Sequence, residues 1–286
     1  MDAHTVGNRP PRTGDDRPAL LTPAASWLSG ALAVIASVTS LLGLAATWPY
    51  AGETENWRLQ AQGQDAGNLL AVATLVVGLL SARRGSQRGL LVWIGSMLYL
   101  SYVAVLYAMT IHFGPLFLGY VACLGLGGYG LILTLAGTLP MIELSDRAVR
   151  TASVVLIVIG LGFALLWLSQ IVGALVAGRA PAELAEAGLV SNPVHVLDLA
   201  LVLPAMVMTA INARRGHPVA RLLLTPWLVF SALIASSLVA VGLLSGAPAA
   251  LLAGFLLVTA VSAGAAAVVL REVRNHSDPL PPSART

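Results

Sequence analysis

The chain has 286 residues, of which 57% are hydrophobic and only 10% charged, with a formal net charge of +3. A soluble domain carries roughly 25% charged residues, so a soluble core could not cover this much apolar surface. The composition therefore excludes a soluble globular protein and predicts an integral membrane protein. All of the basic charge comes from arginine, and no basic face with interleaved aromatic residues is present. We therefore expect no nucleic-acid partner, and the lipid bilayer is the first expected partner.

Apolar runs of about 20 residues, each long enough to span a bilayer, recur along the whole chain. We predict eight of them, at 27–48, 65–80, 90–111, 115–139, 152–177, 193–211, 222–244 and 249–270. The predicted fold is thus all-α, a polytopic membrane bundle of eight transmembrane helices. The polar segments 1–25 and 272–286 are predicted to be cytoplasmic tails, the first of them disordered.

The arginines are unevenly divided between the two predicted membrane faces. Only Arg58 and Arg179 fall on one face, and the remaining arginines fall on the other. Cytoplasmic loops are enriched in arginine and lysine, so the pattern predicts that both termini are cytoplasmic. The expected location is the bacterial cytoplasmic membrane.

Two similar strings indicate an internal repeat. Residues 81–85 (Ser-Ala-Arg-Arg-Gly) join the second and third spans, and residues 212–216 (Asn-Ala-Arg-Arg-Gly) join the sixth and seventh. They predict two tandem four-helix halves, at 26–150 and 151–271, which share one orientation in the membrane.

Polar side chains gather near the predicted non-cytoplasmic face. A charged side chain in hydrocarbon costs about 2.5–3.5 kcal/mol on insertion scales, so it usually faces a partner or a water-filled cavity. Asp65 opens the second span, and Asn192, His195 and Asp198 follow one face of the sixth span at steps of three. We predict a ligand- or ion-binding site that opens outward between the two halves. Its candidate residues are Asp65, Asn68, His112, Asn192, His195 and Asp198, with Tyr99 and Tyr102 in a secondary role.

Simpler interpretations of these residues stay open. Asp65 could be an ordinary residue at a helix N-terminus, stabilised by the helix dipole. His195 could form only local hydrogen bonds, and the tyrosines could be packing residues. The external segments 49–64 and 181–189 could be solvated connectors, the second containing a short helix. Pro204 predicts a kink in the sixth span, just below Asp198.

Other chemistries have weaker support in the sequence. His112 and His195 could hold haem, or zinc together with Asp198, but the local spacing typical of such sites is missing. The glycine-rich segment 124–130 lies inside an apolar run, which favours close helix packing over a nucleotide-binding loop. The single cysteine, Cys123, is expected to be a buried apolar residue. We therefore predict neither a metal nor another cofactor and assign no catalytic residues.

Three short strings carry a resemblance to known proteins. They are Gln64-Asp65, the segment 112–117 (His-Phe-Gly-Pro-Leu-Phe) and the segment 196–199 (Val-Leu-Asp-Leu). With these strings the chain resembles a group of bacterial multi-pass inner-membrane proteins with no assigned activity. The resemblance implies a topology and no reaction.

The leading functional hypothesis is a transporter-like or ligand-binding membrane protein. In it, Asp65 and Asp198 would bind a small cationic or protonated ligand, and His195 would modulate their charge. One alternative is an intramembrane enzyme that acts on a lipid or on a periplasmic-side substrate, with Asp198 and His195 as an acid–base pair. Another is a membrane assembly or structural factor that binds an unidentified protein partner.

Overall fold

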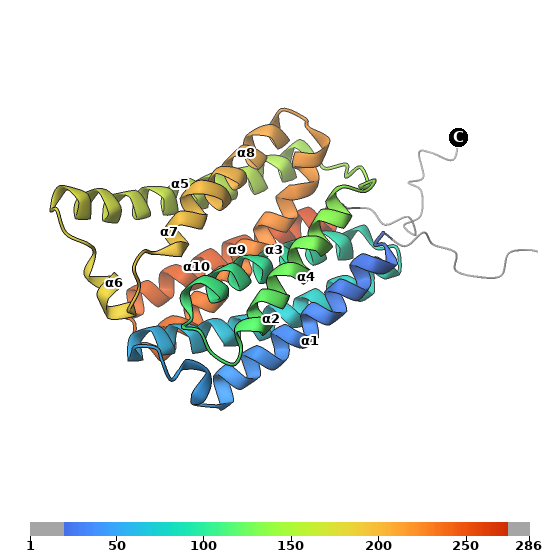
Figure 1. Ribbon diagram of the computed structural model, residues 1–286. Coiled ribbons are helices and arrows are strands. Elements are labelled where there is room, and N and C mark those ends of the chain that lie inside the picture. The colour runs from blue at the N-terminus through green and yellow to red at the C-terminus, as the bar shows by residue number, and fades with distance from the viewer. Residues whose placement is uncertain (1–19, 274–286) are drawn as a thin grey trace, which may run out of the picture.

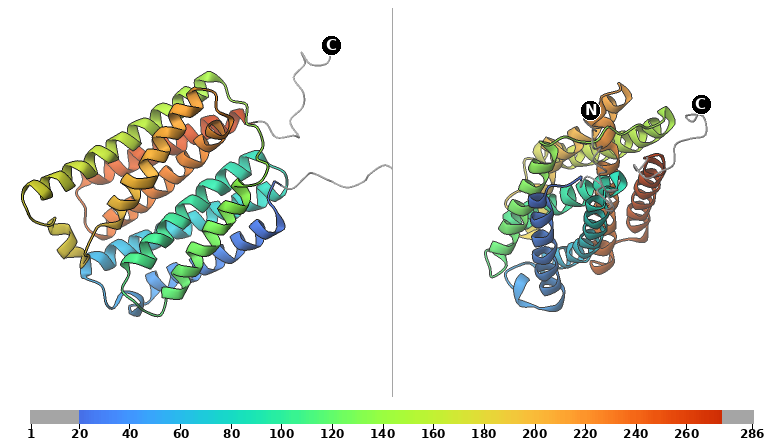
Figure 2. Two further views of the ribbon diagram at one scale, coloured as in Figure 1. Left: turned by 45° about the horizontal axis from the view of Figure 1, so that its top comes forward. Right: turned by 90° about the vertical axis from the view of Figure 1, so that its right-hand side faces the viewer.

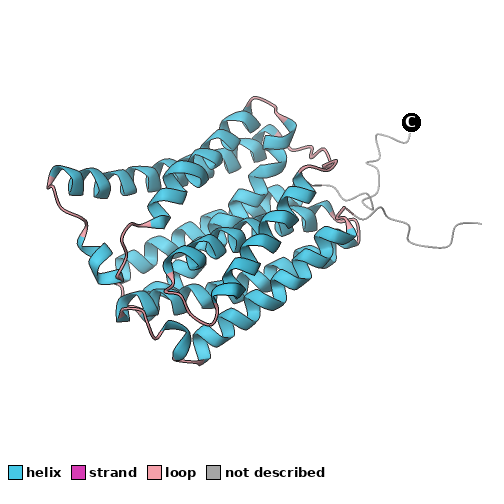
Figure 3. Cartoon of the chain, viewed as in Figure 1, coloured by secondary structure: helices cyan, strands magenta, loops and turns pink. Residues whose placement is uncertain are grey.

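The computed structural model describes residues 20–273, and all regular structure in this part of the chain is helical (Figure 3). Eight helices are long and apolar enough to cross a membrane, which confirms the predicted all-α, multi-pass fold. Most of the two predicted tails lies outside the described residues. The first helix, however, begins at Pro23 and so includes residues 23–25 of the first predicted tail, and the last helix includes Glu272 of the second.

Most of the spans are single helices, and their labels appear in Figure 1. They are α1 (Pro23–Ala45), α2 (Glu55–Arg83), α3 (Gln87–Thr110), α4 (Phe117–Leu135), α5 (Asp146–Val176), α9 (Pro218–Leu244) and α10 (Ala249–Glu272). The sixth span is composite: α7 (Pro193–Leu197), the π-helical turn η2 (Asp198–Val202) and α8 (Leu203–Arg214). Two short helices lie outside the spans, η1 (Trp48–Tyr50) and α6 (Ala182–Ala187). The short helix predicted within 181–189 is therefore confirmed as α6, which ends at Ala187 and is followed by the cap residue Gly188 with φ +71°.

Helix α2 differs most from its prediction. It begins at Glu55, where the Thr54 Oγ1 accepts a hydrogen bond from the Trp57 N–H at 3.3 Å, and not at Asp65. At 1.5 Å per residue α2 is about 43 Å long, well beyond the hydrocarbon thickness of about 30 Å. The predicted connector 49–64 is thus mostly helical. Asp65 lies within the helix, so the helix-dipole interpretation of this residue is wrong.

The spans form two rings of four helices. In the first ring α1 and α3 each pack against both α2 and α4, and in the second ring α5 and α9 each pack against both α8 and α10. The rings meet mainly where α9 packs against α2 and α3 (Figure 2). Helices α2, α4, α8 and α10 finish at one end of the bundle, which we call the arginine-rich end. We call the opposite end the far end. The arginine-rich end carries Arg83, Arg84, Arg88, Arg147, Arg150, Arg214, Arg215, Arg221 and Arg271.

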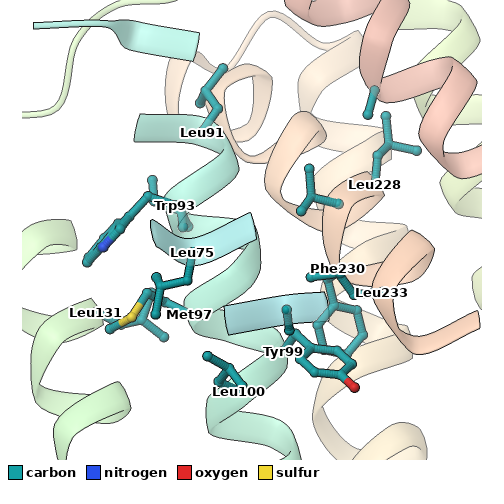
Figure 4. Packing of buried hydrophobic residues seen from close by; sticks show 14 of the residues in the cluster. Leu75, Leu91, Trp93, Met97, Tyr99, Leu100, Leu131, Leu228, Phe230 and Leu233 are labelled. Atoms are coloured by element: carbon teal, nitrogen blue, oxygen red, sulfur yellow. The ribbon is translucent and has the colours of Figure 1, made fainter. Parts of the chain in front are cut away.

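Helix α3 lies at the centre of the packed core. In its most apolar stretch 72% of the residues are buried, against 22% for α5 and for α10. Figure 4 shows Trp93 and Met97 of α3 near Leu75 of α2 and Leu131 of α4. Trp93 Nε1 also donates a hydrogen bond to the Ser29 Oγ of α1 at 2.9 Å. The exposed apolar faces of α5 and α10 are therefore available to lipid, as are exposed apolar residues of α1 and α4.

Small residues bring the two rings together. A Cβ added to Gly63 of α2 would overlap the backbone of Val241 in α9, and one added to Gly67 would overlap Ser237. Because Gly63 and Gly67 are four residues apart, they lie on one face of α2 and let α9 approach closely.

The predicted packing role of the glycine-rich segment 124–130 holds for only part of it. Gly127 lies against Ser101 and Gly130 lies against Met97, both on α3. At Gly125 and Gly128, by contrast, an added Cβ would meet no atom within 4 Å. Cys123 is buried, in agreement with its predicted role.

Candidate functional site

The sixth span changes its helical form where its polar residues lie. Asn192 caps α7, and its Oδ1 accepts a hydrogen bond from the Val194 N–H at 3.0 Å. Asp198 opens the π-helical turn, and its carbonyl oxygen accepts from the N–H of Leu203, five residues further on. Pro204 follows directly and has no N–H to donate. A π-helical turn thus lies just before Pro204, the residue at which a kink was predicted, and such turns are frequent at functional sites.

The Asp198 carboxylate is held by two neutral donors. Tyr102 Oη of α3 donates to Oδ1 at 3.0 Å, and Trp167 Nε1 of α5 donates to Oδ2 at 2.9 Å. Three spans from both rings therefore meet at this side chain. Neither donor is charged, so the two hydrogen bonds orient the carboxylate but leave its negative charge uncompensated.

Asp198 lines a cavity of about 480 Å³ between the two rings, which we call the inner cavity. Most of its wall is apolar or aromatic, with side chains from α2, α3, α5, the sixth span, α9 and α10. Its polar lining comes from Gln60, Gln64, Tyr102, Gln170, Asn192, Asp198 and Ser231. A few polar groups in an otherwise apolar wall are typical of small-molecule sites.

A larger hollow of about 880 Å³, the outer vestibule, adjoins the inner cavity at the far end. Its wall includes Arg179 and Glu183 from the segment between α5 and the sixth span. The two hollows share Trp167, Gln170 and Asn192 among their lining residues. The vestibule and the inner cavity are thus neighbouring hollows with part of their walls in common.

His195 lies in the outer vestibule and does not line the inner cavity. Its ring packs on Trp167, with the ring centroids 4.7 Å apart and an angle of 39° between the planes. Its backbone N–H lies 3.4 Å from Asn192 Oδ1. Trp167 therefore separates the imidazole of His195 from the cavity while it binds Asp198 through its own N–H.

Asp65 does not join Asp198, contrary to the predicted shared site. Its side chain is 0% exposed and lines neither the inner cavity nor the vestibule. Tyr50 Oη donates to its Oδ2 at 2.5 Å, and Tyr107 Oη lies 3.0 Å from its Oδ1. The reason is the direction of the side chain: Gln64 faces the inner cavity, and Asp65, one residue further on, points into the first ring.

Two further predicted residues also lie away from the inner cavity. Asn68 is 5% exposed, and its Nδ2 donates to Ser40 Oγ of α1 at 3.2 Å, inside the first ring. His112 lies in the turn after α3, where its Nδ1 is 3.0 Å from Glu53 Oε2 and its N–H donates to Glu53 Oε1. The predicted single cluster thus consists of separate groups.

The two secondary tyrosines contact different polar partners. Tyr102 binds Asp198, and Tyr99 Oη accepts a hydrogen bond from Gln64 Nε2 at 2.6 Å. Gln64 Oε1 in turn accepts from Ser237 Oγ of α9 at 3.2 Å, which connects α2, α3 and α9 beside the cavity.

Sequence reasoning missed most of the polar and aromatic residues of the cavity wall, including Trp167, which donates to Asp198. They are Trp57, Gln60, Gln64, Phe163, Trp167, Gln170, Phe230, Ser231 and Phe255. Gln64 and Gln170 stand out as polar residues within or beside apolar runs, a signal that could have identified them. Trp57 contributes a buried Nε1 without a hydrogen-bond partner among the described residues. No group of three or more His, Cys, Asp or Glu side chains that could hold a metal ion occurs within residues 20–273.

No protein-family model, no curated protein and no solved structure matches the chain. The resemblance to uncharacterised bacterial membrane proteins therefore stays a prediction.

Proposed function

We propose that the protein is a ligand-binding or transporter-like membrane protein whose inner cavity takes a small hydrophobic cation. The observation that carries this proposal is the environment of Asp198. It is a carboxylate on the wall of a mainly apolar cavity, and both of its hydrogen bonds come from neutral donors. A cationic ligand would compensate this charge in a place where water screens it poorly.

The rest of the wall suits the apolar part of such a ligand. Phe163, Trp167, Phe230 and Phe255 contribute aromatic side chains to the inner cavity. Aromatic faces attract cations, most strongly when the cation is desolvated. The volume of about 480 Å³ lies within the range of about 300–1,000 Å³ usual for small-molecule sites.

The architecture supports transport over catalysis. A binding site at the contact between two helical halves is common in transporters built from repeats, and we propose that the two rings are such halves. An acid–base pair would need Asp198 and His195 at one substrate. These residues line different hollows, on either side of Trp167, which favours binding over the enzyme hypothesis.

We also propose that the arginine-rich end faces the cytoplasm of a bacterial cell, as the positive-inside rule suggests. The vestibule would then open to the outside. Two exposed residues allow a direct test: Met141 at the arginine-rich end is 76% exposed, and Val190 at the far end is 101% exposed.

In a Cys123→Ser background, a membrane-impermeant maleimide is expected to label Val190→Cys in spheroplasts and Met141→Cys only after lysis. The labelling is measured as a mass shift on a gel. Labelling of Met141→Cys in intact spheroplasts would contradict the proposed orientation, and the Cys123→Ser parent is the control.

Binding of a defined cation tests the function. We expect the full chain in lipid nanodiscs to bind protonated phenylbutylamine at least about tenfold more tightly than phenylbutanol, a difference of about 1.4 kcal/mol. The alcohol matches the amine in shape but carries no charge, so the comparison isolates the contribution of Asp198. Equal affinity for both, measured by calorimetric titration, would contradict the proposal. Recovery of the amine unchanged, checked by mass spectrometry, separates binding from catalysis.

A further inference from the structure

The first ring encloses a second carboxyl group that is separate from the inner cavity. Asp65 is 0% exposed, and its partners Tyr50 and Tyr107 are 1% and 6% exposed. Helix α1 covers the group closely, because a Cβ added to Gly43 would overlap both Asp65 Oδ2 and Tyr50 Oη. The carboxyl group is therefore sealed from lipid and from bulk water.

Three short oxygen–oxygen distances surround this carboxyl group. Tyr50 Oη lies 2.5 Å from Asp65 Oδ2, Tyr107 Oη lies 3.0 Å from Asp65 Oδ1, and Tyr107 Oη lies 2.9 Å from the Ala61 carbonyl oxygen. Each distance is that of an O–H···O hydrogen bond, and three such bonds need three protons unless Tyr107 shares its single proton between two acceptors. The two phenols supply two protons, and the carbonyl supplies none. A proton on Asp65 supplies the third.

The charges around Asp65 also favour the protonated, neutral form of its carboxyl group. The titratable groups that face Asp65 are Tyr50 from η1, Tyr107 from α3 and Tyr120 from α4. The other polar groups around it are neutral, the Ser40 hydroxyl of α1 and the Asn68 amide of α2. Burial raises the pKa of Tyr50, so its hydroxyl keeps its proton and acts as a neutral donor at neutral pH. A sealed carboxylate with only neutral groups around it would be a buried charge without a cation, and protonation removes that charge.

We propose that Asp65 is a proton-binding site, in which the protonated carboxyl donates through Oδ1 to Tyr107 Oη while Tyr107 donates to the Ala61 carbonyl. Oδ2 accepts from Tyr50. Release of this proton to water requires a local opening of the first ring, because the closed ring excludes bulk water. The Tyr107 hydroxyl then turns toward Oδ1 and donates to the carboxylate. Asp65 shares no hydrogen-bond partner with Asp198.

Infrared difference spectroscopy of the full chain in nanodiscs tests this proposal. With aspartate labelled by carbon-13 at the carboxyl group, wild-type protein at neutral pH is expected to show a carboxylic-acid C=O band that is lost in Asp65→Asn. The same band should persist in Asp198→Asn, the matched control. If Asp65→Asn removes instead the stretching bands of an ionised carboxylate, the proposal is overturned.

A second variant keeps the test decisive if Asp65→Asn does not fold. In Tyr107→Phe the carboxylic acid would lose the oxygen that accepts its hydrogen bond, so its C=O band is expected to persist and move to higher frequency. An unchanged band would overturn the proposed chain of hydrogen bonds. Asp65→Asn is also expected to bind phenylbutylamine as the wild type does, so this proposal and the cation-binding proposal fail on different measurements.

Discussion

Replacing Asp198 by asparagine is expected to abolish the preference of the protein for a cation over a neutral analogue. The substitution keeps an oxygen that can accept from Tyr102 or Trp167, so the shape of the inner cavity is largely retained. It removes the negative charge, and a hydrogen bond to a charged group is worth about 1.5–3 kcal/mol. The affinity for phenylbutylamine should therefore fall about tenfold to a hundredfold, while the affinity for phenylbutanol should not change.

Calorimetric titration of both compounds in nanodiscs measures this effect. Asp146→Asn is the matched control, because it removes the same charge from a side chain that is 95% exposed at the arginine-rich end. Tyr102→Phe is a useful companion, since it removes one of the two donors to Asp198 and leaves the charge in place. If Asp198→Asn still prefers the amine, another group provides the charge selectivity and the assignment is wrong.

The eight spans could be predicted from the sequence because lipid imposes a simple requirement. A helix that crosses hydrocarbon needs a long apolar run, and each predicted run falls largely within one of the observed spans. The polar first turns of α2 were missed for the same reason. Residues 55–64 lie beyond the apolar run, where the sequence pattern cannot distinguish a helix packed on protein from a solvated connector.

The direction of individual side chains was much harder to predict. Periodicity and charge can indicate how far along a helix a residue lies. They placed both Asp65 and Asp198 toward the far end. Which neighbour a side chain meets depends on how a helix is rotated in its ring, and that rotation is set by packing. The face of α2 that packs on α9 is marked by Gly63 and Gly67, a signal that the sequence contains. With that face assigned, Gln64 rather than Asp65 could have been placed near the second ring.

Helix α3 relates the two polar centres to each other. Its Tyr102 binds Asp198, its Tyr99 binds Gln64 beside the inner cavity, and its Tyr107 contacts Asp65 in the first ring. The inner cavity and the proposed proton site thus share α3, and they also share α2, which carries both Gln64 and Asp65. Asn68 connects them, because Gln64 Nε2 donates to its Oδ1 at 3.4 Å and its side chain also contacts Asp65. Coupling between the two centres can therefore pass through Asn68 or through the positions of α2 and α3.

Replacing Gly63 by leucine is expected to produce the largest loss of stability of any single substitution at the contact between the rings. The backbone of Val241 occupies the place where a Cβ would lie, and backbone cannot move aside as a flexible side chain can. Overpacking costs typically about 1–3 kcal/mol, and more where neighbours are rigid. We expect α2 and α9 to be forced apart, the thermal midpoint in detergent to fall by about 5–10 °C, and binding of phenylbutylamine to weaken.

Gly162→Leu is the matched control for this prediction. Gly162 lies in the middle of α5, and a Cβ added there would meet no atom within 4 Å, so the same substitution adds no clash. Leucine is a better helix former than glycine by almost 1 kcal/mol, so without a clash the thermal midpoint should stay level or rise. A fall of similar size in the thermal midpoints of both variants would show that replacing glycine destabilises these helices even where there is no clash. Only a fall confined to Gly63→Leu would place the critical contact between the two rings at α2 and α9.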